Sequence, residues 1–111
     1  MLDEGVPKPL AAKLRALDVD AVAFPNGWKQ LSNGKLLDAI EGDGFNVLVT
    51  NDKSIPHQQN LRGRRIAVLV LPTNRLRDVL ANVERVAQAV VSAEPGVVVR
   101  MSPFPDITAT S

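Results

Sequence analysis

The chain has 111 residues, 45% of them apolar and 23% charged, and its formal net charge at pH 7 is +1. This length and composition predict one domain with its own apolar core and exclude a disordered chain. Because the sequence has no cysteine and only one histidine, disulfides, zinc–thiolate sites and Cys–His nucleophiles are excluded, and oxygen ligands for Mg²⁺ or Mn²⁺ remain.

The first half of the chain predicts two short strands and two helices. Residues 1–3 form a very short first strand that ends in an acid. A helix begins near Pro7, a residue type that is tolerated in a first helical turn. The apolar run of residues 21–24 predicts a second strand, which a Pro-Asn-Gly turn ends. The second helix follows, with Ser32 or Asn33 as its cap.

The second half predicts three strands and one long helix. Residues 47–49, 66–71 and 97–99 are apolar at successive positions, which is typical of strands that are covered on both faces in a parallel sheet. Between the last two runs, apolar residues recur at helical spacing over 75–92. We expect one helix there, with Asn74 as its cap.

This alternation of strands and helices predicts an α/β domain. An open, mainly parallel sheet of four or five strands should have helices on both faces, giving three α/β/α layers. The domain should cover residues 1–101, and residues 102–111 should be a flexible tail. No apolar run approaches the roughly 20 residues of a membrane span, and no signal peptide pattern is present. We therefore expect a cytoplasmic protein without a membrane partner.

Two acids follow predicted strands, and they are the candidate catalytic residues. Asp3 ends the first strand and Asp52 follows the polar pair after residues 47–49. In an open parallel sheet, ligands bind at the carboxyl ends of the strands, where these acids should meet. Neighbouring carboxylates repel one another unless a cation neutralises them, so the pattern predicts a Mg²⁺ site for phosphodiester chemistry. Alternatively, the two acids only cap the turns that follow them. The side chain of Glu4 points to the opposite face of the sheet if the first strand continues through it.

A group of amides and basic residues is the candidate nucleic-acid-binding set. It consists of Gln58, Gln59, Asn60, Arg64 and Lys53. Amides can contact base edges or phosphates and arginine can clamp phosphate; the alternative is a solvated turn. The only tryptophan, Trp28, either stacks on a base or covers the edge of the core.

Several segments together resemble compact PIN-like domains in their order and spacing. They are residues 2–7 (LDEGVP), 26–28 (NGW), 31–37 (LSNGKLL), 44–53 (GFNVLVTNDK), 58–61 (QQNL), 63–64 (GR) and 66–71 (IAVLVL). The resemblance covers about residues 2–90. It implies a metal-dependent endoribonuclease of the PIN-like type, in bacteria often the toxin of a toxin–antitoxin pair.

The resemblance also implies roles for individual residues. Asp3 would be the first metal-binding acid and Asp52 the later one, with Glu4 and Asn33 as supporting ligands. Many relatives have an acid at the position of Asn33, and another at the position of Ser54. The neutral residues here would weaken metal binding. The implied partners are an RNA substrate and an antitoxin protein, and a homodimer is left open.

Two other functions remain open from the sequence. One keeps the PIN-like fold but loses catalysis, leaving a module that binds RNA or protein. The other is a receiver-like signalling domain phosphorylated on Asp52. Thr73 follows the fourth strand as that domain requires, but Met101 and its neighbours supply no lysine after the fifth.

Overall fold

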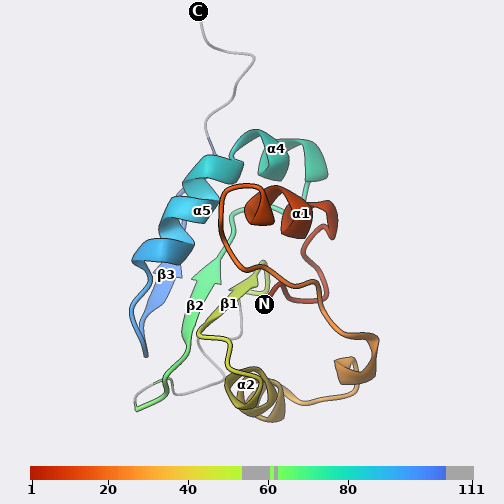
Figure 1. Ribbon diagram of the computed structural model, residues 1–111, viewed down its shortest axis with the longest axis vertical. Helices are drawn as coiled ribbons and strands as arrows, with labels where there is room; N and C mark the ends of the chain where they lie inside the picture. The colour runs from red at the N-terminus through yellow and green to blue at the C-terminus, as the bar shows by residue number, and fades with distance from the viewer. Residues whose placement is uncertain (54–60, 62, 105–111) are drawn as a thin grey trace, which may run out of the picture.

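The computed structural model describes residues 1–53, 61 and 63–104, and within this part the protein is a mixed α/β domain with an open parallel sheet (Figure 1). The strands are β1 (Val47–Thr50), β2 (Ala67–Val70) and β3 (Val98–Arg100), in the order β1-β2-β3. In the register of the two parallel pairs, Val47 lies opposite Ala67, and Val68 lies opposite Val98. The predicted α/β class and parallel sheet are thus confirmed. The described residues form three strands, not the predicted four or five.

Helices cover both faces of this sheet. They are α1 (Pro9–Arg15), α2 (Asn33–Gly42), α4 (Leu76–Ala81) and α5 (Val83–Ser92), with the 3-10 helix η1 (Asn26–Trp28) before α2. Alternate strand residues belong to two separate apolar clusters: Val49 and Leu69 pack with α1, α4 and α5, whereas Leu48 and Val68 pack with α2. This alternation follows from the pleat, which points successive side chains to opposite faces.

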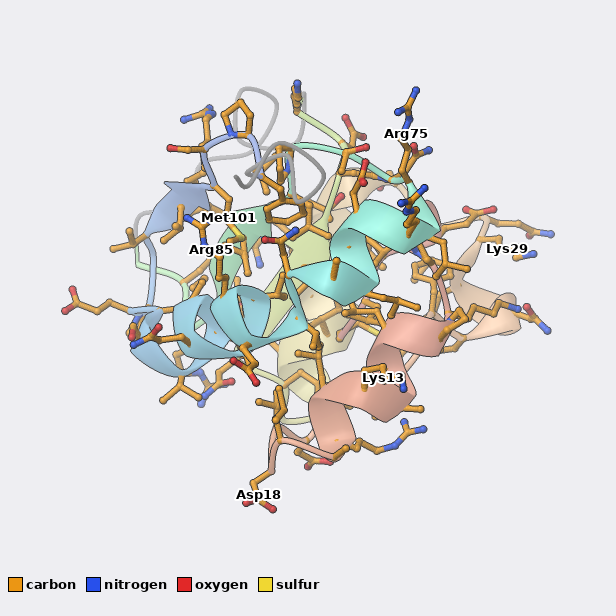
Figure 2. All side chains as sticks on the ribbon, turned by 90° about the horizontal axis from the view of Figure 1, so that it is seen from above. Lys13, Asp18, Lys29, Arg75, Arg85 and Met101 are labelled. Atoms are coloured by element: carbon orange, nitrogen blue, oxygen red, sulfur yellow. The ribbon has the colours of Figure 1, made fainter. Side chains whose placement is uncertain are left out.

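The outer faces of the helices are polar. Charged side chains such as Lys13 on α1 and Arg85 on α5, which are labelled in Figure 2, are exposed. After α1 the chain reverses at Asp18, whose φ of 64° is left-handed, a conformation that aspartate tolerates better than most residues. Among the described residues, none of the helices has the length and apolar character needed to cross a bilayer.

The first two predicted strands are reduced in the structure. Leu2 forms a single parallel bridge with Val49, so that residues 1–3 run beside β1. Residues 21–24 form no strand, although the carbonyl of Val22 accepts the N–H of Leu2 at 2.9 Å. Pro25 has no N–H to extend such a ladder, and the chain turns at once into η1. The predicted strand over residues 21–24 is therefore wrong.

The predicted helix over residues 75–92 is broken at Asn82. Its backbone leaves the helical region with φ −115° and ψ 22°, and its side-chain amide donates to the Asp78 carbonyl at 2.8 Å. Asparagine side chains compete in this way with helical backbone bonds. The predicted cap at Asn74 is also wrong, since Arg75 is the residue that precedes α4.

The second helix begins as the sequence indicates. Ser32 precedes the first turn of α2, although its side chain makes no capping bond. At the other end of the chain, Phe104 is half-buried and packs against the cluster formed by α1, α4 and α5. Ordered packing thus reaches three residues into the segment predicted as a tail, and residues 105–111 lie outside the described part.

Candidate functional site

The N-terminal segment carries Asp3 to the carboxyl end of β1. Val49 donates its N–H to the Met1 carbonyl at 2.9 Å, and the N–H of Asp3 donates to the Val49 carbonyl at 2.8 Å. Between them, the side chain of Leu2 is 1% exposed and lies in the core. These contacts fix the backbone on both sides of Leu2, so Asp3 emerges beside the last residue of β1.

Thr50, that last residue, links the two candidate acids. Its hydroxyl donates to Oδ2 of Asp3 at 2.6 Å and accepts the backbone N–H of Asp52 at 3.0 Å. The Thr50 residue is fully buried, and its hydroxyl uses both its donor and an acceptor site in this way. Thr50 therefore orients the carboxylate of Asp3 and also the turn on which Asp52 is carried.

A second contact fixes the same two segments to one another. The side-chain amide of Asn51 donates to the carbonyl of Gly5 at 3.0 Å. A Cβ atom on Gly5 would lie 2.8 Å from Oδ1 of Asn51, closer than such atoms approach without movement. The absence of a side chain at Gly5 thus allows the loop after Asp3 to lie against the end of β1.

Both acids line one cleft of about 520 Å³. Its lining residues are Asp3, Glu4, Gly5, Phe24, Trp28, Lys29, Leu31, Leu36, Asn51 and Asp52. Asp3 is half-buried, whereas Glu4 and Asp52 are exposed. The polar part of the cleft comes from the turn that begins at Asp3 and from the turn after β1. The segment from Phe24 to Leu36 supplies the apolar part together with Lys29, whose side chain projects outward (Figure 2).

The other predicted site residues are distributed as follows. Glu4 lines the cleft beside Asp3. Asn33 begins α2, between two residues of the cleft lining, but its side chain is not described. Lys53 is exposed and follows Asp52 without lining the cleft. Gln58, Gln59 and Asn60, like Ser54 and His57, lie outside the described residues.

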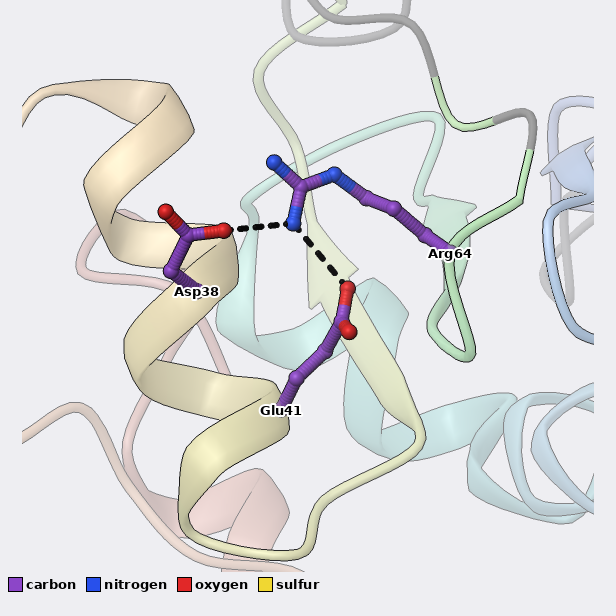
Figure 3. Close-up of polar contacts among 3 residues, drawn as sticks. All are labelled: Asp38, Glu41 and Arg64. Atoms are coloured by element: carbon purple, nitrogen blue, oxygen red, sulfur yellow. Dashed lines mark hydrogen bonds and ion pairs between the residues drawn. The ribbon is translucent and has the colours of Figure 1, made fainter.

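Arg64 is held elsewhere, at the amino end of β2. Its Nη1 donates to Oδ1 of Asp38 at 2.8 Å and to Oε1 of Glu41 at 3.0 Å, both on α2 (Figure 3). These bonds raise the pKa of Arg64 above its ordinary value, with the bond to Asp38 contributing most. In a parallel sheet the amino and carboxyl ends of strands lie at opposite edges, and the cleft is at the carboxyl edge. Arg64 therefore ties the entry of β2 to α2 and does not belong to the cleft.

The residues at the cleft suit a hard divalent cation. The carboxylates of Asp3, Glu4 and Asp52 and the side-chain carbonyl of Asn51 belong to lining residues and are oxygen donors, which Mg²⁺ and Mn²⁺ prefer. Within the described residues, no group of three or more acids and histidines is gathered to hold a metal. Magnesium sites in proteins commonly use one or two carboxylates, with waters and substrate phosphate completing the shell. The donor set thus fits a two-carboxylate site.

Sequence reasoning missed three features of this cleft. In the sequence, Thr50 is one member of the polar pair after residues 47–49, and that position does not reveal its bond to Asp3. The close approach of Gly5 and Asn51 depends on tertiary structure. Lys29 lies next to the only tryptophan, but its sequence position does not indicate that it lines the cleft.

Comparisons with family models, with curated proteins and with solved structures found no match to this chain. The resemblance to PIN-like domains therefore stays a prediction, and the function is argued from the cleft itself.

Proposed function

We propose that this chain is a metal-dependent endoribonuclease with a PIN-like fold, in which Asp3 and Asp52 hold Mg²⁺ or Mn²⁺. One observation carries the proposal: the two acids line the same cleft, and the hydroxyl of Thr50 contacts both the carboxylate of Asp3 and the backbone N–H of Asp52. A divalent ion bound there supplies charge neutralisation for a phosphate group and acidifies a bound water.

The surroundings of Asp3 prepare it for a cation. Its Oδ2 accepts from Thr50 and its Oδ1 accepts from the backbone N–H of Glu4 at 2.8 Å. A carboxylate offers about four acceptor positions, so these two bonds orient the group and leave capacity for a metal. Since Thr50 is buried and Asp3 is half-buried, the carboxylate is presented in a fixed orientation without reorganisation.

RNA is the proposed substrate because the cleft combines phosphate and base chemistry. Lys29 is one of the lining residues, and a lysine ammonium group can contact a phosphate oxygen at the rim of the cleft. Trp28 places an indole in the same lining, and aromatic side chains bind bases of single strands by stacking. A toxin role, with an antitoxin protein covering the cleft, is proposed on the resemblance alone.

The test is metal-dependent cleavage of a mixed RNA pool. Wild-type protein should cleave in Mg²⁺ or Mn²⁺ and stop on addition of EDTA. Asp3→Asn and Asp52→Asn should each lower the rate by about 100-fold or more, since each removes a charged metal ligand. Asp43→Asn is the matched control, because Asp43 is an exposed acid at the end of α2 outside the cleft.

The other outcomes separate the alternatives. Equal cleavage by wild type and Asp52→Asn overturns the catalytic assignment. RNA binding that persists in EDTA, with no cleavage, identifies the binding module. Acetyl phosphate labelling of Asp52 would indicate a receiver-like domain; at the position where that domain needs its lysine, the chain has Met101, whose N–H donates to the Val70 carbonyl at 3.0 Å.

A further inference from the structure

The cleft has an apolar wall that metal chemistry does not need. The wall consists of Phe24, Trp28, Leu31 and Leu36. All four come from the segment that leads into α2 and from its first turns, whereas the acids come from the sheet edge. An apolar wall beside carboxylates and a lysine offers one surface to a ring system and another to a charged group attached to it. The cleft volume of about 520 Å³ falls within the range of such sites.

Trp28 is a residue of this wall that is held both by backbone hydrogen bonds and by packing of its side chain. It ends η1, where its N–H donates to the Pro25 carbonyl at 3.1 Å and its carbonyl accepts the N–H of Leu31 at 3.1 Å. Its side chain is half-buried and packs against the apolar cluster under α2. The indole is thus anchored by the core on one part of its surface and lines the cleft with another. An aromatic group held in this way pays little entropy on binding.

We propose that Trp28 stacks on an unpaired nucleobase next to the phosphate that a divalent ion at Asp3 and Asp52 would bind. This inference rests on the proposed function and narrows its substrate class to RNA that is single-stranded at the cleaved position. A base within a duplex is paired and covered on both faces by its neighbours, so it is not available to the indole. Lys29, next to Trp28 along the chain, is placed to contact a phosphate of the same strand.

The only tryptophan in the sequence makes the contact directly observable. The Asp52→Asn chain in Mg²⁺ is titrated with a short unstructured RNA, and its tryptophan fluorescence is followed. Saturable quenching is expected, because a stacked base quenches the indole. The same strand in a fully paired duplex should bind at least several-fold more weakly. Quenching by the duplex with equal affinity, or RNA binding seen by anisotropy without any change in fluorescence, overturns the inference.

Two substitutions then measure the contribution of the ring. Trp28→Phe keeps an aromatic face, and Trp28→Leu keeps an apolar side chain against the core but removes that face. Stacking of one base typically contributes enough for about a 10-fold change in affinity, so Trp28→Leu should weaken single-strand binding and raise KM by about this factor. Trp28→Phe should stay within a few-fold of wild type. Thermal unfolding of each variant checks that it is folded. If the Trp28→Leu chain does not fold, the fluorescence titration described above alone decides whether Trp28 contacts a base.

Failure of this inference can be told apart from failure of the ribonuclease. If the Trp28→Leu chain folds, cleaves and binds like wild type, Trp28 only covers the core, while the roles of Asp3 and Asp52 stand. If neither wild type nor any variant cleaves RNA but single-stranded RNA still quenches the fluorescence of Trp28, the base-binding role of Trp28 is supported and the catalytic assignment is wrong. Quenching by an unrelated peptide with equal affinity would assign the wall to a protein partner and overturn the RNA assignment.

Discussion

The hydroxyl of Thr50 lies 2.6 Å from Oδ2 of Asp3, although 47 positions separate the two residues in the sequence. The same oxygen accepts the N–H of Asp52. One buried side chain thus helps to determine how the turn after Asp3 and the turn after β1 face each other.

Replacing this side chain should therefore affect both stability and activity. Thr50→Val keeps the shape but leaves Oδ2 of Asp3 and the N–H of Asp52 without their partner, which should cost about 1–3 kcal/mol of unfolding free energy. Thr50→Ser keeps the hydroxyl and should restore most of the cleavage rate at equal metal concentration. The measurements are urea unfolding and the Mg²⁺ dependence of RNA cleavage. Equal metal dependence for Thr50→Val and wild type would show that Thr50 has no positioning role.

Gly5→Ala tests the close approach of Gly5 and Asn51. The new methyl group would meet Oδ1 of Asn51 at 2.8 Å and push the side chain away from its bond to the Gly5 carbonyl. We expect a loss of about 1 kcal/mol, the size of one such hydrogen bond. The loss should shrink in an Asn51→Ala background, as in a double-mutant cycle. Gly27→Ala is the control, since no atom lies within 4 Å of a Cβ built there.

Arg64→Met tests the assignment of Arg64 to the fold and not to the cleft. The substitution removes the ion pairs with Asp38 and Glu41. The side chain of Arg64 is 23% exposed and that of Asp38 is 69% exposed, so we expect a loss of only about 1 kcal/mol, reduced further by salt. Cleavage should be unchanged. The exposed Arg65 provides the control Arg65→Met; a large drop in cleavage for Arg64→Met alone would return Arg64 to the RNA-binding set.

The α-amine of Met1 should make stability depend on pH. In protein that carries a free amine there, the group donates to the Val47 carbonyl at 3.0 Å. Burial lowers its pKa from 8.0 to about 6, against a smaller opposing effect of Asp20. Between these pH values the unfolded chain binds a proton that the folded chain does not, so stability should rise with pH from 6 to 8 by about 2 kcal/mol. Acetylation of the amine should abolish this slope in urea unfolding; an unchanged slope would assign it to another group.

Expression of the chain alone in bacteria tests the proposed toxin role. Growth should slow on induction, because uncontrolled RNA cleavage stops protein synthesis. Asp3→Asn should relieve this effect at equal protein level, judged by immunoblot, and Asp43→Asn should not. Equal growth inhibition by wild type and Asp3→Asn would contradict the toxin proposal without bearing on cleavage in vitro.

Much of the sheet was predictable because β1 and β2 are buried on both faces, whereas β3 is only half-buried and the prediction that residues 97–99 are covered on both faces is wrong. Residues 47–49, 66–71 and 97–99 are apolar without interruption, and each contains or overlaps an observed strand. Residues 21–24 are also apolar but form no strand, because η1 follows directly after Pro25 and leaves this segment no strand ladder to join. Helical periodicity likewise continues across Asn82, where the backbone breaks.

The two acids of the candidate site were predictable from the sequence, but the side-chain contacts around them were not. Topology alone indicated that Asp3 and Asp52 would come to one edge of the sheet, and both line the cleft. The Thr50 link and the pairing of Arg64 with α2 depend on the exact placement of side chains from distant segments, which no local pattern encodes.

The two acids are anchored very unequally. Asp52 follows a strand with a full ladder to β2. Asp3 instead follows two residues that are held to β1 by one bridge and by the bonds of Met1 to Val47 and Val49. Separation of this short segment from β1 would remove Asp3 from the proposed cation site while the ladder between β1 and β2 stays in place. The proposed site therefore depends on the burial of Leu2 as well as on its own acids.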